Sequence, residues 1–71
     1  MTQPEITLNG KPFPLPPDRS IAELLRLLAL PSDGRGVAVA LEGEMIVRGE
    51  WNAVRLQANQ RVEILVAAQG G

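Results

Sequence analysis

The sequence predicts a small α+β domain, in which a mixed sheet of four to five strands is covered on one face by one helix. Three stretches favour this fold class. Alternating segments surround Asn9-Gly10 near the start, "SIAELLRLLALP" has a helical period, and "RVEILVA" near the end has the apolar content of a central strand. A chain of 71 residues makes one domain, and its single helix must cover the sheet.

The segment "PEITLNGKPFPLP" is expected to form a hairpin. Asn-Gly favours a two-residue type I′ turn, because both central residues of that turn need positive φ. The turn then opposes Leu8 to Lys11 and Ile6 to Phe13, which sets the register. Opposed residues share a face, so one apolar surface is expected from Ile6, Leu8, Phe13 and Leu15.

Three alternate prolines, Pro12, Pro14 and Pro16, follow in the second strand of this hairpin. In the expected register, the N–H groups that they lack would all point away from the first strand. Proline is tolerated on an edge strand and blocks pairing with another chain, so this strand is predicted to lie at the edge of the sheet. An irregular proline-rich loop is the alternative.

The helix is predicted to begin after Ser20, which forms a capping box with Glu23 three residues later. Its buried stripe follows the helical spacing and consists of Ile21, Leu24, Leu25 and Leu28. Pro31 is expected to end the helix, and "PSDGRG" is then a loop of turn-forming residues.

Two further strands are expected in "GVAVALEGEMIV", where they form a second hairpin around Glu42-Gly43. The next segment, "RGEWNAVRL", has no clear period. It is predicted to be irregular, with about one helical turn, and to pack inward through Trp51 and Leu56.

The last strand alternates, so Val62, Ile64 and Val66 are expected on the core face and Glu63 and Leu65 on the opposite face. Its apolar richness favours a central position. The first and last strands are then the natural central pair. The order strand, strand, helix, strand, strand, strand predicts a β-grasp, the ubiquitin-like fold.

Composition argues against several classes of function. Seven Lys and Arg against eight Asp and Glu give a formal charge of −1, which does not favour nucleic-acid binding. The chain contains neither Cys nor His, so an autonomous enzyme, a bound metal and a bound cofactor are not expected. The apolar runs are too short to span a membrane and the start lacks a signal-peptide pattern, so we expect a cytoplasmic protein.

The chain ends in Gly70-Gly71, shortly after a predicted core strand. We therefore expect a domain over residues 1–67 and a flexible tail over residues 68–71, with an ordinary frayed terminus as the alternative. Glycine has no Cβ, so a tail made of Ala68, Gln69, Gly70 and Gly71 can thread into a narrow channel and reach about 13–14 Å. Its reactive group is the α-carboxylate of Gly71, which a partner enzyme would have to activate, most simply as an acyl-adenylate made from ATP.

An apolar patch on the open face of the sheet is the candidate docking surface for such a partner. It consists of Leu65 and Ala67, which alternate away from the core, together with Met45 from the second hairpin. Ordinary half-buried sheet residues are the alternative interpretation.

These segments together resemble the ThiS family of small sulfur carriers in thiamine biosynthesis. The likeness covers nearly the whole chain, through "LNG", "SIAELL", "VAVALEGEMIVRGEW" and "RVEILVAAQGG". The chain differs from the usual family pattern at Glu42-Gly43, where members often carry Asn-Gly. It also differs at residues 57–60, where they have an Asp-Gly turn, and at Gln69, where many have a small residue.

The resemblance implies that Gly71 is adenylated by an E1-like adenylyltransferase of the ThiF type, which uses ATP, and is then converted to a thiocarboxylate. Sulfur would come ultimately from a cysteine desulfurase, and a thiazole synthase of the ThiG type would receive it. Two alternatives stay open: the small subunit of molybdopterin synthase or another ubiquitin-like sulfur carrier, and a β-grasp binding module without covalent chemistry. Relatives in the molybdopterin branch tend to be longer around residues 30–36, which favours the thiamine branch.

Overall fold

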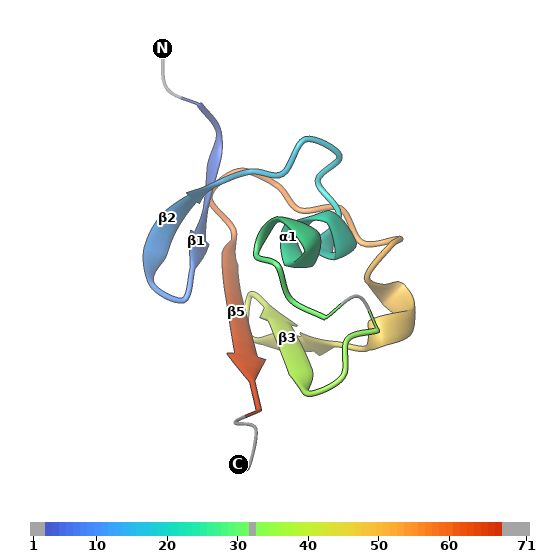
Figure 1. The fold of residues 1–71 in the computed structure, drawn as a ribbon. Helices are drawn as coiled ribbons and strands as arrows, with labels where there is room; N and C mark the ends of the chain where they lie inside the picture. The colour runs from blue at the N-terminus through green and yellow to red at the C-terminus, as the bar shows by residue number, and fades with distance from the viewer. Residues whose placement is uncertain (1–2, 32, 68–71) are drawn as a thin grey trace.

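The computed structural model describes residues 3–31 and 33–67, which form one sheet and one α-helix (Figure 1). The strands are β1 (Glu5–Leu8), β2 (Lys11–Pro14), β3 (Val37–Leu41), β4 (Glu44–Ile46) and β5 (Arg61–Val66). The helix α1 spans Ile21–Leu27, and a short 3-10 helix, η1, spans Arg48–Glu50. Among the described residues, α1 spans only seven residues, and no helix there could span a membrane.

The first and last strands lie at the centre of the sheet, whose order is β2-β1-β5-β3-β4. β1 and β5 are parallel, with Thr7 opposite Arg61 and Leu8 opposite Val62, whereas the other neighbouring strands are antiparallel. Figure 1 shows α1 lying across one face of the sheet. The mixed sheet with one covering helix confirms the predicted α+β class and the β-grasp topology.

The hairpin of β1 and β2 has the predicted register. Ile6 lies opposite Phe13 and Leu8 opposite Lys11, and β2 is an edge strand. Pro16 differs from the prediction. Its side chain is almost fully buried, because the chain leaves the sheet after Pro14 and turns there, with the Arg19 N–H donating to the Pro16 carbonyl at 2.9 Å.

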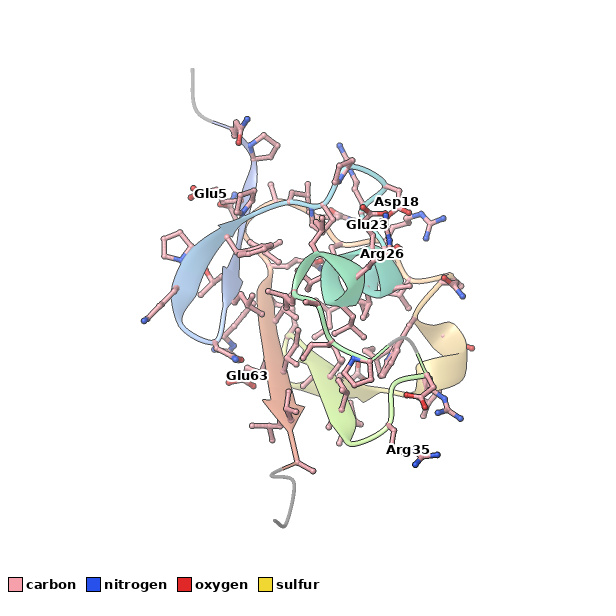
Figure 2. All side chains as sticks on the ribbon, viewed as in Figure 1. Glu5, Asp18, Glu23, Arg26, Arg35 and Glu63 are labelled. Atoms are coloured by element: carbon pink, nitrogen blue, oxygen red, sulfur yellow. The ribbon has the colours of Figure 1, made fainter. Side chains whose placement is uncertain are left out.

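The helix begins where the sequence predicts, with the Ser20 hydroxyl accepting from the Glu23 N–H at 2.9 Å. The reciprocal half of the capping box is different. The Ser20 N–H donates to the Asp18 carboxylate at 2.8 Å, and the Glu23 carboxylate instead accepts from Arg26 (Figure 2). Asp18 takes over the role predicted for Glu23, because its loop brings a carboxylate to the Ser20 N–H from the other side.

The Asp18 carboxylate gives the start of α1 a dependence on pH. The hydrogen bond from the Ser20 N–H, and then the one from the Ser20 hydroxyl, lower the pKa of Asp18 from its ordinary value of 3.8. A carboxyl with a lowered pKa in the folded state stabilises the fold above its ordinary pKa, and this contribution is lost as the pH falls through the folded-state pKa.

We therefore expect Asp18→Asn to lower the melting temperature at neutral pH. The difference from the unchanged protein should shrink as the pH falls below about 3.8. Thermal melts of both proteins across this range test the prediction. A difference that stays the same at every pH would contradict it.

The helix ends before Pro31, through a Schellman motif rather than through the proline. Ala29 has a φ of 59°, and its N–H donates to the Arg26 carbonyl at 3.0 Å. The Leu30 N–H donates to the Leu25 carbonyl, also at 3.0 Å. Alanine stands where glycine is usual.

The core lies between α1 and the covered face of the sheet. Its buried members are Ile6, Ile21, Leu24, Leu25, Val39, Trp51, Leu56, Val62 and Ile64. Trp51 and Leu56 pack inward as predicted, and the Trp51 indole N–H donates to the Ile46 carbonyl at 3.0 Å. Val66 shares the predicted face of β5 with Val62 and Ile64, but it is 53% exposed, since it lies at the end of β5, beyond the part of the sheet that α1 covers (Figure 1).

The second hairpin turns at Glu42-Gly43 as predicted, with φ values of 51° and 84°. Glutamate is unusual at the first of these positions. Here Glu42 binds Arg61 of β5 through both its main chain and its side chain. The Glu42 N–H donates to the Arg61 carbonyl at 2.8 Å, and the Glu42 carboxylate accepts from the Arg61 N–H. These contacts with the neighbouring strand compensate for the less favourable turn residue.

Candidate functional site

The end of β5 is the part of the fold that leads to the C-terminal residues. Val66 lies opposite Val37, and the Ala67 N–H donates to the Gly36 carbonyl at 2.7 Å. Gly36 has a φ of +72°, and a Cβ there would lie 3.5 Å from the Ala67 Cβ. The loop before β3 therefore anchors the chain at Ala67, directly after the end of β5.

On the opposite side, the Asn9 side chain holds β5 after β1 has ended. The Asn9 N–H donates to the Val62 carbonyl at 2.9 Å. The carboxamide then pairs with Ile64, accepting from its N–H at 2.8 Å and donating to its carbonyl at 3.1 Å. A side chain thus replaces the next main-chain partner that β1 would have supplied.

Asn9 also fills a turn position with a φ of 49°, so the two roles need separate tests. We expect Asn9→Gly to lower the free energy of unfolding by about 1–2 kcal/mol, because glycine keeps the positive φ but leaves the Ile64 groups without the carboxamide. Chemical denaturation measures this loss. Asn9→Ala should lose more, since it also disfavours the turn, and equal stability of Asn9→Gly and the unchanged protein would contradict this role.

The open face of the sheet carries the predicted apolar patch. Leu65 is 72% exposed and Met45 is 69% exposed, and Ala67 is also exposed. Between Leu65 and Met45 lie Ala38 and Ala40, since Ala38 is opposite Leu65 and Ala40 is opposite Met45. Two small side chains between two large ones leave a shallow depression of about 410 Å³. We use the name open-face patch for this depression together with Leu65, Met45, Ala67, Ala38 and Ala40.

One side of the open-face patch is polar. Glu63 and Asn9 border the depression beside Leu65. Figure 2 shows Glu63 projecting from β5 on the side of the β1–β2 hairpin. Val47, which follows β4, is 65% exposed and adds apolar surface near this face. The exposed surface is therefore apolar over β3 and β4 and acidic at its border with the hairpin.

Ala38, Ala40 and Val47 were not predicted as part of the site. Ala40 could have been predicted from the two-residue turn at Glu42-Gly43, because that turn fixes which residue lies opposite Met45. Ala38 and Leu65 lie on strands that are distant in sequence, so no connecting turn fixes their register and their pairing could not be predicted.

Ala68, Gln69, Gly70 and Gly71 lie outside the described residues. Within residues 3–31 and 33–67, no group of three or more acidic side chains is arranged to hold a metal ion. The site is thus defined by the end of β5, by the open-face patch and, in sequence, by the Gly-Gly ending.

Comparison with known proteins decides between the possible families of this fold. The model of the ThiS family matches residues 6–71, which include the Gly-Gly ending. The chain belongs to the ThiS family. The crystal structure of a thiamine biosynthesis protein (ThiS) from Geobacter metallireducens is similar to it, with a TM-score of 0.73 and 30% sequence identity. That similarity covers 94% of this chain and 99% of the other. No curated protein matches the chain significantly.

Membership of the ThiS family agrees with the architecture of the described part of the chain. The departures at Glu42-Gly43 and at residues 57–60 are accommodated locally. Glu42 binds β5, and residues 57–60 still turn, with Asn59 at a φ of 72° and its N–H donating to the Glu5 carbonyl at 2.7 Å. These two differences from the usual ThiS pattern therefore lie in turns, whereas the third, at Gln69, lies outside the described residues.

Proposed function

We propose that this protein carries sulfur for thiazole formation in thiamine biosynthesis, as a thiocarboxylate on Gly71. The match to the ThiS family over residues 6–71 is the observation that supports this proposal most strongly, because it includes both terminal glycines. The protein is then a co-substrate of other enzymes rather than a catalyst.

The chemistry begins at the α-carboxylate of Gly71, which is ionised at neutral pH and is a poor electrophile. In an adenylyltransferase of the ThiF type, a carboxylate oxygen attacks the α-phosphorus of ATP and pyrophosphate leaves. A sulfur nucleophile then attacks the carbonyl carbon, and AMP leaves with the attacking oxygen. With hydrosulfide as the nucleophile, the net result is one sulfur in place of one carboxylate oxygen. Sulfur that comes ultimately from a cysteine desulfurase arrives as a persulfide, so the first product is then an acyl disulfide. A thiol must cleave it and is itself oxidised to a disulfide as the thiocarboxylate is released.

The thiocarboxylate would then give its sulfur to a thiazole synthase of the ThiG type. Both enzymes must reach the same end of the chain, so both would contact the surface beside the end of β5. The open-face patch is the exposed apolar surface next to that end, and it includes Leu65, Ala67 and Met45. We propose it as the surface on which these enzymes dock.

Intact-mass measurement tests the carrier function directly. The protein is incubated with ATP, a ThiF-type enzyme and sulfide, and its mass is then measured. Exchange of one oxygen for sulfur, located by fragmentation at Gly71, supports the proposal. An unchanged mass, under conditions in which the enzyme modifies its own carrier, would reject it in favour of a non-covalent binding module.

The docking role of the patch predicts that Leu65→Glu slows thiocarboxylate formation about tenfold or more, with little change in thermal stability. Leu65 is 72% exposed, so a charge there costs little in the free protein but opposes burial against an apolar partner. Leu27→Glu is the matched control, because Leu27 is 50% exposed on α1, away from the open face. Equal rates for both variants would contradict docking on the patch.

A consumption assay separates the thiamine pathway from the molybdopterin pathway. The thiocarboxylate form is offered in turn to a thiazole synthase and to the large subunit of molybdopterin synthase. We expect only the thiazole synthase to return it to the carboxylate form. The match to the ThiS family favours this outcome.

A further inference from the structure

We propose that the main-chain edge of β5 at Val66 pairs, strand to strand, with an extended apolar segment of the enzyme that activates the C-terminus. This inference rests on the proposed function and adds a second contact to it. The open-face patch offers side chains, whereas this edge offers main-chain hydrogen bonds beside the residues that lead to Gly71.

The direction of the main-chain groups follows from the contacts of β5. The Arg61 carbonyl accepts from Glu42 and the Ala67 N–H donates to Gly36, so these residues direct their main chain toward β3. The main chain of Val62 and that of Ile64 point the other way, toward Asn9. Because alternate residues of a strand point the same way, the N–H and carbonyl of Val66 also point away from β3.

Val66 has no main-chain partner among the described residues. It lies opposite Val37 in a non-hydrogen-bonded pair, and the Val37 N–H donates to the Gly34 carbonyl at 3.1 Å. On its other side the ladder stops with the Asn9 carboxamide, which binds Ile64. Figure 1 shows β5 extending past the tip of the β1–β2 hairpin, so on the side away from β3 no strand of the described chain lies beside the end of β5.

The protein limits pairing at its outer strands but not at this edge. β2 carries Pro12 and Pro14, which have no N–H to donate, and β4 is only three residues long. At the end of β5, by contrast, Val66 is 53% exposed and Leu65, on the opposite face, is 72% exposed. A strand laid along Val66 would make main-chain hydrogen bonds and could cover apolar surface on both faces.

The reactive end explains why the occupant would be the activating enzyme. Gly71 is the fifth residue after Val66, which gives a span of about 16–18 Å when the chain is extended. Pairing at Val66 would fix the direction in which these residues leave the domain. It would thereby lower the entropy cost of bringing the Gly71 carboxylate to ATP in the enzyme.

Amide hydrogen exchange tests the pairing at the atom concerned. Exchange at Val66 is measured in the free chain and in its complex with a ThiF-type enzyme without ATP, and the same preparations are tested for thiocarboxylate formation. We expect the Val66 amide to exchange rapidly in the free chain and at least tenfold more slowly in the complex. The Ala67 amide, which donates to Gly36, should be protected in both and serves as the internal control.

Val66→Pro provides an independent readout, because it removes the N–H. Thiocarboxylate formation at low carrier concentration should fall about tenfold, which corresponds to the loss of one hydrogen bond. Val66→Ala is the matched control, since it shortens the side chain but keeps the N–H, and it should lose much less. Both variants should melt at similar temperatures, because this N–H has no partner in the described fold.

The outcomes separate the two proposals. Thiocarboxylate formation with protection at Val66 supports the pairing. Thiocarboxylate formation with rapid exchange at Val66 in the complex overturns the pairing and leaves the carrier function standing. Slow exchange of the Val66 amide already in the free chain would also overturn the pairing with the enzyme. If that protection depends on protein concentration, a second copy of the chain occupies the edge, and if it does not, another part of the same chain does. Absence of any thiocarboxylate would overturn both.

Discussion

Deletion of Gly71 should abolish thiocarboxylate formation while leaving the melting temperature unchanged. The shortened chain still ends in a glycine carboxylate, that of Gly70, so the reacting group keeps its chemistry and only its position changes. One residue fewer withdraws the carboxylate by about 3.3–3.6 Å. A misplacement of about 1 Å can already cost 10²-fold in rate, so loss by at least that factor is expected.

A second variant, Gly71→Ala, separates the length of the tail from its width, because it keeps the length of the chain and adds one Cβ. If the terminal glycines pass through a narrow channel, this variant should also lose activity, although its carboxylate can reach the same place. Intact mass measures the modification, and thermal melting measures the fold. A large fall in melting temperature on deletion would contradict the prediction, because it would assign Gly71 a structural role.

Gly34→Ala should lower the free energy of unfolding by about 2–5 kcal/mol, the largest loss expected for a single methyl group in this fold. Gly34 has a φ of +71°, and a Cβ there would lie 2.6 Å from Cζ3 of Trp51 and 2.8 Å from Cδ of Arg48. The Trp51 ring cannot easily move away, since its indole N–H donates to the Ile46 carbonyl and only 6% of its surface is exposed.

Gly10→Ala separates the two causes of this loss. Gly10 has a φ of +84°, but a Cβ there would have no heavy atom within 4 Å. It should therefore lose only the conformational part, about 1–2 kcal/mol. In a domain of this size, each kcal/mol of lost stability lowers the melting temperature by roughly 4–8 °C, so both effects are measurable. Equal losses in the two variants would show that the contact with Trp51 adds nothing.

Features that depend on a few neighbouring residues could be predicted from the sequence. Asn9-Gly10 set the register of the first hairpin, because the geometry of a two-residue turn leaves one way to oppose the strands. Ser20 marked the start of the helix, and its hydroxyl accepts from the N–H three residues later. Prolines at alternate positions identified an edge strand.

Predictions that failed involved residues whose partners or cover come from elsewhere in the fold. Asp18 takes the contact expected for Glu23, because the path of a loop decides which carboxylate reaches Ser20. Pro16 is buried where the chain turns inward, and Val66 is exposed where α1 no longer covers the sheet. Alternation along a strand gives the face of a side chain, but not how far the covering helix extends.

The candidate site divides in the same way. Residue type and alternation were enough to predict the Gly-Gly ending, the strand that leads to it and the apolar character of Leu65 and Met45. The pairing of Ala38 with Leu65, which completes the floor between Leu65 and Met45, became visible only in the folded protein, as did the contact of Asn9 with Ile64 fifty-five positions away. Such contacts depend on which strands become neighbours, and that choice is made by packing the whole core.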